Sequence, residues 1–263
     1  MIAYIIMALI AYFIGSISFS VIISKKFAGF DVREKGSKNA GSTNVLRTVG
    51  KKAALLTLVC DISKGIVAVL ISLLIGLIAK NSSKAILVEL AALFVVIGHT
   101  YPIFFGFKGG KGVATSLGLI LIINWKIGLI CLIFALSLMA ITRMVSLGSI
   151  SAAILFAILV IFFRDESYIV NYDASFILFG ILLAGLVIFN HRSNLKRIIA
   201  GTENRLSFKN AGNKEEEKTE AKEEINTEKK EEDVEVVEQK NNQNNIDDIE
   251  ISSDKGKNII NNK

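Results

Sequence analysis

The chain has 263 residues, of which 52% are hydrophobic, and a formal net charge of +6 at pH 7. This modest total hides two parts, because residues 1–213 carry 21 Lys and Arg against 8 Asp and Glu, whereas residues 214–263 carry 9 against 16. The composition excludes a water-soluble fold for the first part. It also excludes a packed core for the second, which has too little apolar area to offset its ordering entropy. We therefore predict a transmembrane domain at 1–213 and a disordered, acidic tail at 214–263.

The apolar runs predict an all-α integral membrane protein. A transmembrane helix needs about 20 apolar residues, and fewer inside a bundle. Runs that meet or approach this length lie at residues 2–23, 53–79, 85–104, 113–123, 127–141, 147–163 and 174–190. We expect a polytopic bundle of about seven (roughly five to seven) transmembrane helices. The run 113–123 is too short to cross alone, so it forms either a half-helix or, with the next run, one long tilted span over 113–141.

A loop rich in hydrogen-bond donors, Gly36–Arg47, follows the first predicted span. It holds two glycines, three hydroxyl side chains, two asparagines, a lysine and an arginine, and no carboxylate. Small residues let backbone N–H groups converge, and the fork of a guanidinium suits a phosphate, so this composition is typical of an anion site. The alternative is that Ser37, Asn39 and Asn44 are plain turn and cap residues and that Arg47 faces lipid headgroups.

A second donor-rich loop, Lys108–Gly112, follows the third predicted span. It is not a nucleotide-binding P-loop, because a glycine stands where Ser or Thr must follow Lys111. The lysines flank Gly109 and Gly110, which places ammonium groups beside accessible backbone N–H groups. The helix predicted at 113–123 points its N-terminus at the same spot. The alternative is a basic turn at the membrane interface with a belt of aromatic residues.

His99 and His191 are the two histidines, and each lies in a donor-rich segment on the same predicted membrane face. For each histidine, a role in a binding or catalytic site and a role as a structural hydrogen-bond donor are equally consistent with the sequence. Neither has Cys, Asp or Glu at metal-ligand spacing, so we predict no metal site. Asp61 and Lys64 lie three residues apart on one face of the second span. Because charge is costly inside a membrane, we predict that they pair with each other, with lining of the site as the alternative.

Other polar candidates lie towards the end of the transmembrane domain. Ser146 lies in a short turn, where capping of the next helix is its alternative role. Asn194 and Arg197 are three residues apart and share a face of a predicted exit helix. Glu203 is an isolated acid that either locks a basic cluster or orients a substrate hydroxyl.

Loop charge predicts the orientation in the membrane. Residues 25–52 carry eight Lys and Arg and residues 191–213 carry five, whereas the alternate loops carry few. Positive-inside reasoning places the N-terminus outside and the C-terminus in the cytoplasm. All donor-rich loops then share the cytoplasmic face, where one site can use them together.

In order and spacing, these motifs resemble the integral-membrane acyl-phosphate:glycerol-3-phosphate acyltransferases, the PlsY family. The resemblance covers about residues 1–208, and the tail has no counterpart in it. It rests on Gly15-Ser16, Gly-Ser-x-Asn-x-Gly-x-Thr-Asn-x-x-Arg at 36–47, Asp-x-x-Lys-Gly at 61–65, Gly98-His99 through Thr115, Ser146, and His191-Arg-x-Asn-Leu-x-Arg through Glu203. Lys38 departs from the motif, which has glycine there. It is strained if the position needs a positive φ, and otherwise it adds a cation.

The resemblance implies transfer of a fatty acyl group from acyl phosphate to the 1-hydroxyl of sn-glycerol 3-phosphate. The products are lysophosphatidic acid and phosphate, and the step is the first acylation of bacterial phospholipid biosynthesis. Either His99 or the substrate's own phosphate accepts the hydroxyl proton. The implied substrate-binding residues are Ser37, Asn39, Asn44, Arg47, Lys108, Gly109, Gly110, Lys111, Ser146, His191, Asn194 and Glu203.

We expect a multi-pass protein of the bacterial cell membrane whose active site faces the cytoplasm. It uses no cofactor, binds no nucleic acid, and makes transient contact with the enzyme that produces acyl phosphate. The donor follows from leaving-group chemistry, because an acyl phosphate is an activated anhydride that needs alignment more than activation. The His-x4-Asp pattern of acyl-CoA-type acyltransferases is missing, since Phe104 and Lys196 stand five residues after the two histidines.

Two other classes of protein remain open from the sequence. A transporter or channel for phosphorylated anions explains the basic loops, but it predicts polar breaks near mid-span rather than at one membrane face. A scaffold whose acidic tail recruits partners is the third interpretation.

Overall fold

The computed structural model describes residues 1–162 and 174–206, and every regular element in these ranges is helical. The helices are α1 (Ile2–Gly15), α2 (Phe19–Ala28), α3 (Ser42–Thr48), α4 (Lys51–Ile78), α5 (Lys84–Thr100), α6 (Val113–Ile123), α7 (Trp125–Thr142), α8 (Val145–Phe162), α9 (Ala174–Asn190) and α10 (Arg192–Ile199), with 3₁₀ turns η1 (Val32–Glu34) and η2 (Ile103–Phe105). Five helical segments in the described ranges are long and apolar enough to cross a membrane, or six if the bent pair α9–α10 is one span. The predicted all-α integral membrane class is therefore confirmed. The predicted tail at 214–263 and its boundary lie outside the described residues.

Two pairs of glycines allow close approaches between helix backbones. A Cβ on Gly15 of α1 would collide with the backbone of α5 at Val95, and a Cβ on Gly98 of α5 would collide with the Tyr12 carbonyl of α1. Gly65 of α4 and Gly118 of α6 form a similar pair, each lying against the backbone of the other helix. Small residues allow such close backbone packing, which drives helix association where lipid removes the hydrophobic contrast.

The structure decides between the two alternatives for the run 113–141. α6 ends at Ile123, and the side chain of Asn124 caps α7 by accepting a hydrogen bond from the Ile127 N–H at 3.1 Å. Gly128 of α7 lies against Leu121 of α6, so α7 folds back on α6 instead of continuing it. At 1.5 Å per residue, α6 is only about 16 Å long. It is thus a half-helix, and one long span over 113–141 is wrong.

Two apolar clusters hold the described chain together. The larger one packs α1 and α4 to α9 through buried side chains such as Met7, Leu87, Leu119 and Leu183. The smaller one, which includes Val21, lies under the first loop. Many Leu, Ile and Phe side chains on the outer faces of the helices are exposed. That is the surface a bilayer would cover.

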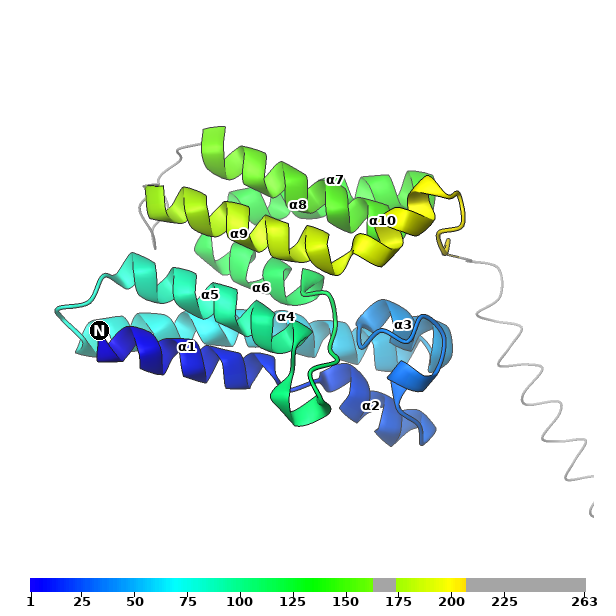
Figure 1. Ribbon diagram of the computed structural model, residues 1–263, viewed down its shortest axis with the longest axis horizontal. Helices are drawn as coiled ribbons and strands as arrows, with labels where there is room; N and C mark the ends of the chain where they lie inside the picture. The colour runs from blue at the N-terminus through cyan, green and yellow to red at the C-terminus, as the bar shows by residue number, and fades with distance from the viewer. Residues whose placement is uncertain (163–173, 207–263) are drawn as a thin grey trace, which may run out of the picture. The chain divides into compact units, whose positions relative to one another are not determined.

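The donor-rich segments gather at one end of the bundle. In Figure 1, α3, α10 and the loop before α6 lie at that end, whereas the N-terminus of α1 and the connection from α4 to α5 lie at the other. The short turn between α7 and α8 is also at the donor-rich end. One site can therefore draw on loops that are far apart in sequence. The side of the membrane that this end faces stays a prediction.

Candidate active site

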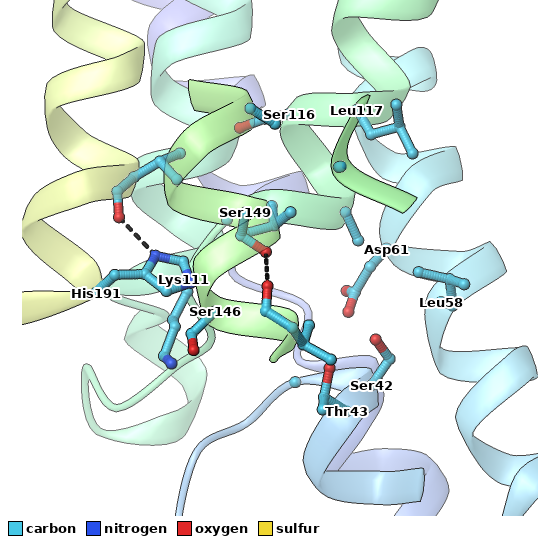
Figure 2. Close-up of a pocket in the computed structure, with 18 of the residues that line it drawn as sticks. Ser42, Thr43, Leu58, Asp61, Lys111, Ser116, Leu117, Ser146, Ser149 and His191 are labelled. Carbon is cyan, nitrogen blue, oxygen red and sulfur yellow. Dashed lines mark hydrogen bonds between the residues drawn. The ribbon is translucent and has the colours of Figure 1, made fainter. Parts of the chain in front are cut away.

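A cavity of about 530 Å³ opens at the donor-rich end of the bundle. Its walls come from α3 to α10 and the loops that join them. Polar side chains line its mouth, and the rest of its lining is largely apolar. Figure 2 shows Lys111, Ser146 and His191 on one side of this pocket, and Asp61 with Ser42 on the other.

The first loop folds around the side chain of Asn44, which is only 2% exposed. Its Oδ1 accepts a hydrogen bond from the Ser37 N–H at 2.9 Å, and its Nδ2 donates to the carbonyls of Val32, Lys35 and Asn39 at 2.8–3.1 Å. One amide thus satisfies four backbone groups of an irregular segment. Asn44 lines the cavity, but its polar atoms serve the loop and hold Ser37 and Asn39 at the mouth.

Lys38, the departure from the motif, has a backbone φ of +57°. This is the left-handed region, which costs a side-chain-bearing residue about 1–2 kcal/mol. Its side chain is exposed, and Lys38 is not among the residues that line the cavity. Of the two readings offered by the sequence, the strained one therefore fits the structure.

In the second loop, the glycine N–H groups are not free for a ligand. Gly109 donates to the Thr100 carbonyl at 3.0 Å and Gly110 to the His99 carbonyl at 3.1 Å, so both groups fasten the loop to the end of α5. A Cβ on Gly110 would overlap the His99 ring. The expectation of accessible N–H groups at these two positions is thus corrected, because packing against α5 consumes them.

Lys108 also lies outside the cavity lining, and its side chain is exposed. Its carbonyl instead accepts a hydrogen bond from Arg33, whose guanidinium also donates to the Phe105 carbonyl at 2.6 Å. Arg33 is in turn held by Asp31, at 2.8 Å from Nη2 to Oδ2. The hydrogen bond and charge of Arg33 lower the pKa of Asp31 below its ordinary value, although burial opposes this.

Arg33 lies in η1, just before the first loop, and therefore ties this turn to the second loop. Sequence reasoning did not single it out. Its separation of two residues from Asp31 was the one signal available. A short acid–base spacing of this kind is too common to identify a clamp.

Glu203 organises the opposite wall of the mouth. Its Oε1 accepts hydrogen bonds from Ser146 Oγ at 2.8 Å and Asn194 Nδ2 at 2.7 Å, and its Oε2 accepts from Arg197 Nε at 2.8 Å. Burial alone would raise the pKa of Glu203. The three hydrogen bonds and the charge of Arg197 outweigh it, so the pKa is lowered. An ionised Glu203 thus joins the segment that follows α10 to Ser146 of α8 and to Asn194 and Arg197 of α10.

Of the cations that line the cavity, Arg197 pairs with Glu203, whereas Arg47, Lys51 and Lys111 form no ion pair with the described residues. Lys111 instead donates to Asn194 Oδ1. Burial, together with the charges of Arg197 and Arg47, lowers the pKa of Lys111 to about 8, against the opposing charge of Glu203. A partly desolvated cluster of positive charge gains free energy when an anion enters, which points to a phosphate-bearing ligand.

His191 is buried beside these cations, at the junction of α9 and α10. Its Nδ1 lies 2.8 Å from the Val187 carbonyl, a contact drawn as a dashed line in Figure 2. A carbonyl oxygen only accepts, so Nδ1 is the donor in this bond. Nε2 is then the ring atom left to meet a ligand.

A buried charge cluster supports the cavity wall from within the bundle. Asp61 Oδ1 lies 3.0 Å from Lys64 Nζ and 3.4 Å from His99 Nδ1. Lys64 also donates to the carbonyls of Gly15 and Ile17 at the end of α1. The predicted pairing of Asp61 with Lys64 is confirmed, and Asp61 and His99 also line the cavity.

The cavity therefore brings most of the predicted site residues together. Three of them, Lys108, Gly109 and Gly110, lie in the loop behind it. Those that line it are Ser37, Asn39, Asn44, Arg47, His99, Lys111, Ser146, His191, Asn194 and Glu203.

Comparison with known proteins identifies the family. The family model described as glycerol-3-phosphate acyltransferase matches residues 5–201. A glycerol-3-phosphate acyltransferase of Clostridioides difficile is 43% identical over 211 residues, which cover 79% of this chain and 97% of that protein. One from Thermoanaerobacter sp. is 41% identical over 202 residues, which cover 77% and 95% of the two chains. The chain belongs to the glycerol-3-phosphate acyltransferase family.

Solved structures of the family share the fold. The crystal structure of PlsY, an integral membrane glycerol 3-phosphate acyltransferase, in its glycerol 3-phosphate form matches with a TM-score of 0.67 and 36% identity, over 78% of this chain and 96% of that one. Its lysophosphatidic acid form matches with a TM-score of 0.65 and 34% identity, over 78% and 95%. Membership of the glycerol-3-phosphate acyltransferase family makes the chain a membrane acyltransferase and sets aside the transporter and scaffold interpretations.

Proposed function

We propose that this protein transfers a fatty acyl group from acyl phosphate to the 1-hydroxyl of sn-glycerol 3-phosphate. The products would be lysophosphatidic acid and inorganic phosphate, in the first acylation step of phospholipid synthesis at the bacterial cell membrane. The names of the relatives support the acceptor, and the lysophosphatidic acid form of PlsY supports the product. The chemistry of the cavity supports the donor.

The observation that carries the proposal is the two-sided character of the cavity. Its mouth presents Arg47 and Lys111 without acid partners, and its body is lined by leucine, alanine and isoleucine side chains. Both substrates carry a phosphate, and one also carries a long apolar chain. The mouth would hold the phosphates and the body would hold the chain, which places the two reacting groups at their boundary.

The reaction needs alignment and charge neutralisation more than a covalent intermediate. The glycerol hydroxyl oxygen attacks the acyl carbonyl carbon, the bond from that carbon to the phosphate oxygen breaks, and phosphate leaves with the bonding electrons. Cations beside the leaving oxygen stabilise the charge that develops there. Holding both substrates in one cavity lowers the activation free energy, because the reacting groups are already close together and oriented.

We assign roles according to position in the cavity. Ser37, Asn39 and the loop backbone around Asn44 would cradle the acyl phosphate. Arg47, Lys111, Ser146, His191 and Asn194 would hold glycerol 3-phosphate and the shared charge. Glu203 would keep Ser146 and Asn194 in place through its hydrogen bonds.

Two groups are candidates to accept the hydroxyl proton. His99 lines the cavity with its Nδ1 towards Asp61, and its Nε2 packs against Gly110. The substrate phosphate is the other candidate. Because both ring nitrogens of His99 already face protein groups, the geometry favours the phosphate and leaves His99 to hold Gly110 and the wall of the cavity.

The cytoplasmic orientation is part of the same proposal. The donor-rich loops share one end of the bundle, and this end also carries most of the Lys and Arg of the loops. The positive-inside tendency would place that end in the cytoplasm. A cysteine-labelling experiment on intact cells, with single cysteines at positions 35 and 81, would test the orientation.

The site is tested by Arg47→Ala and Lys111→Ala in the purified protein. Each removes a charge-assisted hydrogen bond to a desolvated phosphate, worth about 1.5–3 kcal/mol, so kcat/KM should fall roughly 10-fold to 150-fold. Lys108→Ala is the matched control, because Lys108 lies in the same loop but outside the cavity. Near-normal rates in both site variants would contradict the proposed site.

A further inference from the structure

The apolar part of the cavity runs along one face of α8, away from the cationic mouth. α8 contributes Ser146, Ser149, Ala153 and Phe156 to the lining. These positions recur every three or four residues, so they form a row on one side of the helix. Ser146 lies at the mouth, and a rise of 1.5 Å per residue places Phe156 about 15 Å further along.

A second, much smaller cavity lies deeper in the bundle, with a volume of about 10 Å³. Ile120 and Phe156 line both cavities, so the Phe156 ring is part of the wall that separates them. This ring is well packed, and the residue is only 4% exposed. Behind it lie Phe176 and Phe179, whose ring centroids are 5.6 Å apart.

We propose that Phe156 is the floor of the acyl-chain slot and sets the longest acyl chain that the enzyme uses well. This inference rests on the proposed acyl transfer, because the slot has this meaning only if the apolar part of the cavity holds a fatty chain. The methyl end of a chain whose head is fixed at the cationic mouth would meet the ring. A longer chain would have to bend or leave methylene groups outside the slot, since packed interiors do not yield space freely.

The neighbouring residues define what happens when the ring is removed. Phe156→Ala would join the two cavities and move the floor back to the Phe176–Phe179 pair. The head of the substrate would stay in place, because the mouth residues lie about 15 Å away along α8. The variant should therefore change preference among donors without losing the reaction.

The test compares saturated acyl phosphates from lauroyl to arachidoyl, with glycerol 3-phosphate at saturation and purified full-length protein. In Phe156→Ala, kcat/KM for donors longer than the wild-type optimum should rise at least about tenfold relative to that optimum, since single methylenes in a pocket are discriminated on this scale. An unchanged ranking of donors in an active Phe156→Ala variant would overturn the proposal.

Two further variants test whether a change in donor preference comes from the position of Phe156 at the end of the slot or from a general loss of packing. Phe179→Ala is the matched control, because Phe179 is equally buried at 4% exposure but lines only the small cavity. It should leave the ranking of donors as in the wild type, and a shift like that of Phe156→Ala would contradict the inference. Ala153→Phe places a ring one turn nearer the mouth and should shorten the preferred chain.

Ala153→Phe keeps the proposal testable if Phe156→Ala does not fold, since it changes the slot in the opposite direction. A wild-type protein that is inactive with every acyl phosphate would overturn the proposed function. An active wild type whose profile is moved by neither variant would overturn only the role of Phe156.

Discussion

At the scale of single residues, Lys111 should set a pH dependence. Burial lowers its pKa to about 8, so the ammonium that would bind phosphate in the proposed site is present below that pH and is lost above it. In the free enzyme, kcat/KM for glycerol 3-phosphate should therefore fall as pH rises through about 8, by up to about tenfold per unit. Lys111→Arg should reduce this fall of kcat/KM at high pH, because a guanidinium stays protonated. Equal falls in both proteins would exclude Lys111 as the titrating group.

Lys38 offers a test of backbone strain. Its φ of +57° favours glycine, and its side chain is exposed. Lys38→Gly should therefore raise the free energy of unfolding by about 1 kcal/mol and leave kcat and KM unchanged. Lys35→Gly is the control, because Lys35 has a φ of −124° and glycine gains nothing there. Thermal unfolding in detergent measures both. A weaker affinity for acyl phosphate in Lys38→Gly alone would instead assign Lys38 a phosphate contact.

Residue types in the loops were enough to predict an anion site, because glycines, hydroxyls and cations without carboxylates are unusual together. The hydrogen-bond partners of these groups were not predictable. Whether the Gly110 N–H is free depends on the end of α5 lying beside it, and the four hydrogen bonds of Asn44 depend on how the loop closes. Such contacts form only when segments that are distant in sequence meet in the fold. The sequence therefore indicates which groups are hydrogen-bond donors, but not which of them are left free to bind a ligand.

At the scale of helices, the glycine contacts give a sharp prediction. A Cβ on Gly118 would overlap the Ile62 backbone of α4. Gly118→Ala should therefore separate α6 from α4 and cost about 1–3 kcal/mol of stability. It should also lower activity, because both helices line the cavity. Gly185→Ala is the matched control in α9, where an added Cβ meets nothing within 4 Å. Equal stability of the two variants would show that the α4–α6 contact is not tight.

The helices themselves were predictable from length and hydropathy, and their bounds agree with the apolar runs to within a few residues at most ends. The break between α6 and α7 was not. Both runs are apolar, so hydropathy reads them equally well as one span or two. What decides is the cap of Asn124 on α7 and the packing of Gly128 against α6, which are features of the folded hairpin.

At the scale of the whole molecule, every described residue that lines the cavity precedes the predicted tail, and the last of them is Asn204. Truncation after residue 213 should therefore leave kcat and KM for both substrates unchanged in the purified protein. The measurement is a steady-state assay of full-length and truncated protein at matched concentration. A truncated protein that inserts but has no activity would place part of the catalytic domain beyond residue 213.

The identity of the acyl donor is the most direct test of the proposed reaction. Purified protein is given labelled glycerol 3-phosphate with palmitoyl phosphate, palmitoyl-CoA or palmitoyl acyl carrier protein in separate reactions, and labelled lysophosphatidic acid is measured. Palmitoyl phosphate should support turnover, and free inorganic phosphate should inhibit it by competing for Arg47 and Lys111. The two thioesters should give little product, because neither histidine is followed at the fifth residue by the aspartate of the His-x4-Asp pattern that serves as general base in acyl-CoA-type acyltransferases. Efficient turnover with palmitoyl-CoA, or a trapped acyl-enzyme, would contradict direct transfer from acyl phosphate.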